Sequence, residues 1–472
     1  MTTRINVEVG QRLPLADATL RLLDYVTDDA FLASVFERFR GRCFERDLAF
    51  PVFVRLMSDA LLGHRGSAHQ AFRRAQEEGT LETSVQAMYD RLGTLPCEVS
   101  KGWFAEATAR LDAVGLCLTD ALPRSLIDYR PVALDGKKLK YVAKRLKPLR
   151  GLKGNVLGGK LVVVQDMATK RALVVEAALD GEAADNPLVP GAVAQARAVL
   201  DSSRRLWVGD RGFCDFKTLH LLSEGDDAFV VRHHAKCKFH RDPSIPARKG
   251  KDDLGRAYRE EWGWLGGPDN KNRVAVRRIT VTRPSGEPLM LVTSLMDADR
   301  YPAFDLLVLY RRRWGIETMF QRVVQTFDLR HLIGGTPEGT VFQAVFCLLL
   351  YNITLIVRDY VAEGAERTPE TISLHLLYND IVDELTAWMK VIGPNATVAV
   401  LAHTMFAGPK DFQRYLQRTI GGVWTARLAK AKTTKRPPRQ PPRAYLKGGH
   451  SSVDRILRGE HDEIPIKPHS PT

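Results

Sequence analysis

The sequence predicts an α/β protein with a mixed sheet, helical regions at both ends and a β-rich insertion, and three observations lead to this prediction. Residues 1 to about 125 carry apolar side chains at helical spacing, as in PVFVRLMSDALLG (51–63). From about 128 strand-like runs alternate with helical stretches, which is the pattern of a sheet covered by helices. Helical patterns return near 301 and continue to about 430.

Length and charge restrict the possible functions. The chain has 472 residues, and its 69 Lys and Arg outnumber its 55 Asp and Glu, which gives a net charge of +14. The length favours several domains, and the charge favours a polyanionic partner such as nucleic acid or an anionic membrane surface. Six cysteines without a C-x-x-C pair argue against structural zinc and a disulfide framework. The N-terminus has no signal-peptide pattern, so we expect a cytoplasmic protein.

The longest apolar run, VFQAVFCLLLYNITLIV (341–357), is interrupted by Gln343, Asn352 and Thr354. It falls just short of a membrane span, so we interpret it as a buried core helix and expect no membrane partner.

Changes of pattern divide the chain into six regions. We expect, in this order, a helical domain, the first part of an α/β core, a β-rich insertion, a second core part, a helical C-terminal region and a disordered basic, Pro-rich tail. Their boundaries are 1–125, 126–232, 233–300, 301–360, 361–430 and 431–472. Within the helical domain, the segment SVQAMYDRLGTLP is expected to form a helix that has Ser84 as its N-cap and stops before Pro96.

The core begins with the strand RPVALDG (130–136), followed by a predicted hairpin over 159–181. A helical stretch then leads to the strand RRLWVGD (204–210). Asp135 and Asp210 thus stand at strand ends, where α/β sheets usually place functional groups. Taken singly, each aspartate fits a tight turn or a strand cap equally well.

The segment YRRRWGIE (310–317) supplies a third acid. On a continuous helix, Tyr310, Arg313 and Glu317 fall within about 60° of one another. Arginine suits a phosphate and a carboxylate suits Mg²⁺, so this face fits chemistry on a phosphodiester, although an ordinary Arg–Glu pair at i, i+4 explains it as well. Two-metal phosphodiester chemistry needs carboxylates from several segments, and Asp135, Asp210 and Glu317 are such a set.

A basic stretch follows the first aspartate. Residues 135–160 contain nine Lys and Arg and no acid after Asp135. We expect a surface that follows DNA phosphates, with a simple solvated loop as the alternative. The candidate DNA-binding residues here are Lys137, Lys138, Lys140, Lys144 and Arg145.

The strand VALDG, the block GDRGF and the helix YRRRWGIETMF together resemble the DDE transposases of bacterial insertion sequences, in the group with a Tyr-Arg-Glu-Lys signature and a β-strand insertion before the glutamate. The segment SVQAMYDRLGTLP is similar to the DNA-binding region of that family, and the resemblance covers roughly residues 40–360. One position departs from the signature: Val324 stands where the family has its lysine, and Gln325 or Arg322 could replace that charge only in part.

The resemblance implies a ribonuclease H-like core in which Asp135, Asp210 and Glu317 bind two Mg²⁺ or Mn²⁺ ions. Tyr310 and Arg313 would contact phosphate, and the helical domain 1–125 would bind DNA. The implied activity is cleavage at the terminal inverted repeats of an insertion sequence and strand transfer into target DNA, performed by a homodimer on double-stranded DNA. Two alternatives stay open: a catalytically impaired or domesticated DNA-binding protein, and a ribonuclease H-like nuclease without strand transfer.

Overall fold

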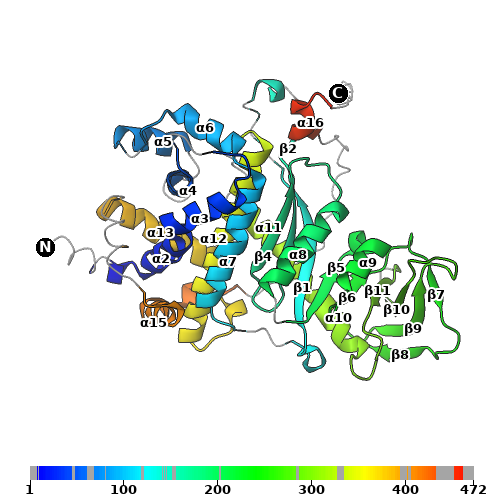
Figure 1. Cartoon of the computed structure of the whole chain (residues 1–472). Coiled ribbons are helices and arrows are strands. Elements are labelled where there is room, and N and C mark those ends of the chain that lie inside the picture. The colour runs from blue at the N-terminus through cyan, green and yellow to red at the C-terminus, as the bar shows by residue number, and fades with distance from the viewer. Residues whose placement is uncertain are drawn as a thin grey trace, which may run out of the picture.

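The structure is a computed structural model that describes residues 8, 10–44, 48–60, 68–79, 81–118, 122–140, 142, 144, 146–150, 156–200, 203–282, 286–326, 334–393, 401, 406–431 and 451–460. A helical half, built from both ends of the chain, lies beside a long mixed sheet (Figure 1). The α/β class with helices flanking a mixed sheet, predicted from the sequence, is therefore confirmed.

Ten strands of the described chain form the large sheet, and two short strands form a second one. The strands are β1 (Arg130–Lys138), β2 (Val156–Leu157), β3 (Lys160–Asp166), β4 (Ala172–Ala178), β5 (Arg205–Gly209), β6 (Ala228–Arg232), β7 (Phe239–Arg241), β8 (Arg248–Lys251), β9 (Ala257–Leu265), β10 (Val274–Val281), β11 (Leu289–Thr293) and β12 (Ser451–Ser452). The order in the large sheet is β4-β3-β1-β5-β6-β11-β10-β9-β7, with β8 also paired to β9.

The first five strands of this order carry the core. β1 pairs antiparallel with β3 and parallel with β5, and β5 pairs parallel with β6. β4 pairs antiparallel with β3, so the predicted hairpin over 159–181 is confirmed. Parallel neighbours need crossover connections, and helices provide them here between β4 and β5 and between β5 and β6. This is the ribonuclease H-like arrangement that the resemblance implied.

Strands β7 to β11 form the β-rich insertion that precedes Glu317. They do not form a sheet of their own, because β11 pairs antiparallel with β6 and extends the core sheet. Within the insertion the fully buried Arg277 forms an ion pair with Glu260 from the neighbouring strand. The insertion is thereby fixed to the edge of the core rather than joined to it by a flexible linker.

The two faces of the sheet pack against different helices. Val132 and Leu134 of β1 belong to a core shared with α8 (Val189–Val199) and α9 (Phe216–Leu222). Ala133 belongs instead to the larger core shared with the helical half. Because side chains alternate along a strand, Asp135 and Lys137 lie on the same face as Ala133.

The helical half is one core made of both chain ends. Its helices from the N-terminal side are α2 (Pro14–Thr27), α3 (Asp29–Phe39), α4 (Phe50–Ser58), α5 (Ala68–Glu77), α6 (Val85–Thr94) and α7 (Cys97–Val114), and from the C-terminal side α12 (Pro337–Gly364), α13 (Leu374–Val391) and α15 (Pro409–Ile420). As predicted, α6 is capped by Ser84, whose hydroxyl accepts a hydrogen bond from the N–H of Ala87, and it ends before Pro96.

Contacts distant in sequence hold this half together. The N-terminus of α2 has no cap from its own segment, and the Glu384 carboxylate of α13 accepts hydrogen bonds from the N–H groups of Leu15 (2.8 Å) and Ala16 (3.0 Å). A carboxylate at a helix N-terminus also complements the helix dipole. The helical N-terminal region is therefore packed into the rest of the molecule and shares its hydrophobic core with α12 and α13.

Helix α12 is the described helix that is long and apolar enough to cross a membrane, with a mean hydropathy of 2.1 over its most apolar window. That window is entirely buried inside the protein, as expected of a core helix. The interpretation of residues 341–357 as a core helix is confirmed.

Asn352 explains one polar interruption of this apolar helix. Its Oδ1 accepts from the N–H of Ala172 at 3.0 Å, and its Nδ2 donates to the carbonyl of the same residue at 2.8 Å. β4 is the edge strand of the sheet, so the side chain satisfies backbone groups that no further strand pairs. We predict that Asn352→Leu lowers the free energy of unfolding by about 1–3 kcal/mol for each of the two buried groups it leaves unpaired.

Urea unfolding followed by circular dichroism measures this loss. Thr354→Val is the matched control, because the Thr354 hydroxyl donates a hydrogen bond to the carbonyl of Leu350 in its own helix. Equal stability of the Asn352→Leu protein and the wild type would show that the amide is not needed at the sheet edge.

The tail corrects the sequence prediction. Residues 431–472 were expected to be disordered, yet within them β12 pairs in parallel with β2 and leads into α16 (Val453–Leu457). Val453 and Ile456 are buried, and Arg455 forms ion pairs with Asp180 and Glu182. A composition that cannot form a core by itself is stabilised here by docking on the existing core.

Candidate active site

The two strand-end aspartates lie next to each other. In the parallel pair β1–β5, Leu134 is in register with Gly209, and Asp135 and Asp210 are the next residues of the two chains. Asp135 still belongs to β1, whereas Asp210 follows directly after β5. The sequence prediction that both acids reach one edge of the sheet therefore agrees with the register.

Each aspartate also has a local backbone role. The Asp135 Oδ1 accepts from the N–H of Gly136 at 2.9 Å. Asp210 is the N-cap of a short 3-10 turn, and its Oδ1 accepts from the N–H of Gly212 at 2.7 Å. The cap that was weighed against a metal role for Asp210 is thus present, and each of these carboxylates keeps a second oxygen for another partner.

The third acid comes from a helix that differs from the predicted one. The sequence pattern predicts one continuous helix, but the structure has α10 (Ala303–Arg312) and α11 (Trp314–Gln325), separated at Arg313. Arg313 itself keeps helical backbone angles, φ −51° and ψ −31°, and it contacts both Tyr310 and Glu317, so the expected placement of the three residues on one face agrees with the structure. α11, with Glu317 in its first turn, packs against β1.

The side chains of Tyr310, Arg313 and Glu317 are neighbours. An Arg313 Nη2 donates to the Glu317 Oε1 at 2.8 Å, and the guanidinium carbon lies 5.6 Å from the centroid of the Tyr310 ring. Tyr310 and Arg313 are both buried. The Arg–Glu pair at i, i+4 that was the alternative interpretation is formed, and it lies beside the two aspartates rather than on a remote surface.

Electrostatics show that the acids share one environment. Burial raises the pKa of the Asp135 carboxyl to about 7; the nearby Arg313 opposes the rise, and the carboxylates of Asp210 and Glu317 add to it. Like charges crowded at a half-buried position favour protonation of one of them. A divalent cation would relieve the same repulsion.

The carboxylates are not gathered into a metal-binding arrangement. Among the described residues, no three His, Cys, Asp or Glu side chains converge closely enough to hold an ion. Asp210 is hydrogen-bonded to the N–H of Gly212, and Glu317 is hydrogen-bonded to Arg313. In chemistry the set fits Mg²⁺ or Mn²⁺, which prefer carboxylate oxygens, and these bonds would have to rearrange for all three acids to reach an ion.

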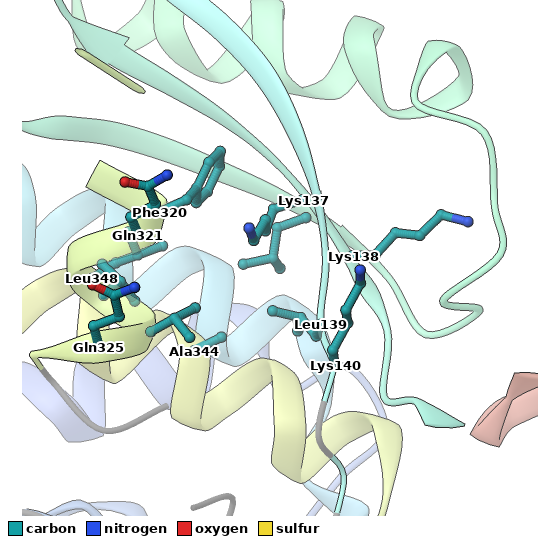
Figure 2. Close-up of a pocket in the computed structure, with 12 residues that line it drawn as sticks. Lys137, Lys138, Leu139, Lys140, Phe320, Gln321, Gln325, Ala344 and Leu348 are labelled. Carbon is teal, nitrogen blue, oxygen red and sulfur yellow. The ribbon is translucent and has the colours of Figure 1, made fainter. Parts of the chain in front are cut away.

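The basic candidates are only partly clustered. Lys137 and Lys138 belong to β1 and Lys140 follows it, and all three line a cavity beside α11 (Figure 2). Lys144 is described but does not line this cavity, and Arg145 lies outside the described residues. Val324, the departure from the signature, lines the same cavity as the three lysines. Of its possible substitutes, Gln325 lines it too, whereas Arg322 interacts with the hydroxyl of Tyr351.

Sequence reasoning missed Arg232. In the parallel pair β5–β6, Gly209 is in register with Val231, so Arg232 stands beside Asp210. Burial raises the pKa of the Tyr310 phenol, and both Arg313 and Arg232 oppose this rise, which places Arg232 at the same site. The sequence did contain a signal: Arg232 follows the apolar run of the strand DAFVVRH, as Asp210 follows the apolar run of RRLWVGD.

Comparisons with known proteins agree with this geometry. Residues 128–353 match the family model described as the transposase DDE domain. This part of the chain is similar to transposase DDE domains. The match begins just before β1 and ends inside α12, so it includes both aspartates, the insertion and Glu317. The predicted resemblance to transposases of insertion sequences is confirmed.

Two curated relatives are similar in sequence to parts of this chain. "Putative transposase y4zB" of Sinorhizobium fredii is 26% identical over 167 residues, which cover 34% of this chain and 44% of the relative. Transposase InsG for insertion sequence element IS4 of Escherichia coli is 33% identical over 132 residues, covering 24% of this chain and 28% of the relative. The chain spans less than half the length of these two relatives.

Among the solved structures similar to this chain is the piggyBac transposase synaptic complex with hairpin DNA. The two chains are 14% identical in sequence, and the match covers 87% of this chain and 76% of the piggyBac chain, with a TM-score of 0.36. This score is too low for the likeness to support a conclusion about the DDE domain.

Proposed function

We propose that the protein is a DNA transposase that cleaves DNA at the ends of an insertion sequence and joins those ends to target DNA. The observation that carries the proposal is the adjacency of Asp135 and Asp210 on neighbouring parallel strands, with Glu317 close enough to act on the same carboxyl, inside a transposase DDE domain. Three acids from three chain segments are what two-metal phosphodiester chemistry requires.

In the proposed mechanism Asp135, Asp210 and Glu317 would hold Mg²⁺ or Mn²⁺. The ions would stabilise the attacking and leaving oxygens of an in-line displacement at phosphorus. The β1–β5 register places Asp135 and Asp210 side by side. Glu317 has to exchange its hydrogen bond from Arg313 for the ion.

Arg313 is the proposed contact to the reacting phosphate. It is buried between Tyr310 and Glu317, and its Nε has no hydrogen-bond partner among the described residues. A buried donor left unpaired is unfavourable, and a phosphate oxygen would satisfy it with a charge-assisted bond. Tyr310 would support the guanidinium from its ring face, and Arg232 would add positive charge on the side of Asp210.

The partner is proposed to be double-stranded DNA, both the terminal inverted repeats of the element and the target. The net charge of +14 and the lysines at the end of β1 favour phosphate contacts. A homodimer would hold two ends together, and the helical region 1–125 would contact DNA outside the site. Work on chromosomal DNA would place this activity in the cytoplasm.

A second candidate function is a DNA-binding protein with impaired catalysis. Two observations favour it: Val324 replaces the lysine of the signature, and the three acids are not converged. A nuclease without strand transfer would use the same acids, and only its products would differ.

The test is an assay on a duplex that carries the boundary between the element and its flanking DNA. The proposal predicts Mg²⁺- or Mn²⁺-dependent nicking at that boundary and, with a supercoiled plasmid present, covalent joining of the cut end to plasmid DNA. Nicking without joining would identify the nuclease. Specific binding with no cleavage in either metal would identify the impaired protein and contradict the transposase proposal.

A further inference from the structure

Next to the acids lies a cavity that the proposed chemistry does not use. It encloses about 210 Å³ between the end of β1 and the helices α11 and α12 (Figure 2). One water takes roughly 30 Å³ of the liquid, so the cavity has room for a small group together with several waters. Its position beside β1 places it within reach of any DNA strand held at Asp135.

The lining of this cavity combines lysines with apolar side chains. Lys137, Lys138 and Lys140 contribute to it, and none of the described residues that line it is acidic. Leu161, Phe320 and Val324 are among its apolar residues. A lysine beside an apolar wall attracts an anion more strongly than a fully solvated one, because less water screens the charges.

Lys137 is the lysine that the surroundings orient toward the cavity. Its Nζ lies 5.6 Å from the centroid of the Phe320 ring, within the range of a cation–π contact. Figure 2 shows Lys137 directed toward Phe320, whereas the side chain of Lys138 extends to the other side of the strand. The alternation of side chains along β1 gives the same result, since Lys137 shares its face with Asp135.

The spacing defines what the cavity could hold. Residues two apart in a strand are about 6.6 Å apart, and successive nucleotides of a DNA strand rise about 3.4 Å along the helix axis. A group at Lys137 is therefore one to two nucleotides from a phosphate that reacts at Asp135. The amide side chains of Gln321 and Gln325, on the α11 side, can also donate hydrogen bonds to such a group.

We propose that this cavity binds one backbone phosphate of the DNA strand, one or two nucleotides from the reacting phosphate, with Lys137 as the main contact and Lys140 at the rim. The inference rests on the proposed function, because it takes the reacting phosphate to lie at Asp135. It assigns a positioning role to Lys137, with Val324 as part of the apolar lining.

The first experiment measures binding without cleavage, using fluorescence anisotropy of the boundary duplex in Ca²⁺ over a range of salt concentrations. Lys137→Gln is expected to weaken binding roughly tenfold and to reduce the slope of log affinity against log salt by about one. A set of duplexes, each with a single neutral methylphosphonate, then locates the phosphate. Wild type should lose affinity at one position near the boundary, and Lys137→Gln should be insensitive at that same position.

Two further variants make the test specific. Lys138→Gln removes the same charge from the same strand but should keep the methylphosphonate effect at that position. Val324→Lys combined with Lys137→Gln places a new ammonium at the cavity from α11 and should restore part of the lost affinity. A melting temperature equal to that of wild type checks that each variant is folded.

An unchanged methylphosphonate profile in Lys137→Gln, or equal loss in Lys137→Gln and Lys138→Gln, would overturn the proposed phosphate site. The proposed function is judged separately, because wild-type cleavage in Mg²⁺ is measured without these variants. Cleavage by the wild type together with an unaltered profile in Lys137→Gln would reject the phosphate site and leave the transposase proposal in place.

Discussion

Replacement of Asp210 by asparagine is expected to abolish metal-dependent cleavage, by roughly 10³-fold or more, while folding and DNA binding are retained. The carboxamide oxygen of asparagine can still accept the hydrogen bond from the N–H of Gly212 that Asp210 accepts at 2.7 Å. The substitution therefore keeps the cap and removes the charge. It separates the two roles that the residue could have after β5.

The measurement is the rate of nicking of the boundary duplex in Mg²⁺ and in Mn²⁺, together with binding to the same duplex in Ca²⁺. Asp135→Asn should show the same loss, because its carboxyl lies in the field of Asp210 and Glu317.

Asp215→Asn is the matched control: Asp215 caps the next helix, with its Oδ1 accepting from the N–H of Thr218 at 3.1 Å. Both Asp215→Asn and the wild type should cleave. If Asp210→Asn cleaves as fast as they do, Asp210 is only a cap.

The parts of the fold that the sequence predicted are those determined by local patterns. The hairpin β3–β4 follows from two β-branched runs joined by a short polar turn, and the start of α6 follows from Ser84. Both aspartates could be placed because an acid at the end of an apolar strand is readable in the sequence. Their adjacency, however, depends on the parallel β1–β5 register, which no local signal contains.

The parts that were missed depend on contacts between distant segments. The basic tail contains the apolar positions Val453 and Ile456 at helical spacing, but their burial depends on β12 finding β2, almost 300 residues earlier. Composition alone therefore assigned the whole tail to disorder. The boundary between α10 and α11 was not predicted either, although Arg313 keeps helical backbone angles there, φ −51° and ψ −31°.

Arg313 is where the second large effect is expected. Arg313→Gln should lower the maximal cleavage rate by roughly 10–150-fold, the equivalent of a charge-assisted bond of about 1.5–3 kcal/mol, because the reacting phosphate loses its buried partner. The same variant should reach half of its maximal rate at a lower Mg²⁺ concentration than wild type. The reason is that Glu317 loses its 2.8 Å hydrogen bond and Asp135 loses a neighbouring positive charge, so both acids attract a cation more strongly.

If the role of Arg313 were purely structural, its loss would not lower both the maximal cleavage rate and the Mg²⁺ concentration that gives half of that rate. Arg313→Lys keeps the charge but not the planar, multiply donating group, so it should retain the wild-type Mg²⁺ requirement and recover only part of the rate. Arg311→Gln is the matched control, because Arg311 is paired with Asp253 of the insertion rather than with the acids. If Arg313→Gln keeps the wild-type rate and Mg²⁺ dependence, the pair of Arg313 with Glu317 only joins α10 to α11. If the rate falls but the Mg²⁺ dependence does not shift, Glu317 is not a metal ligand.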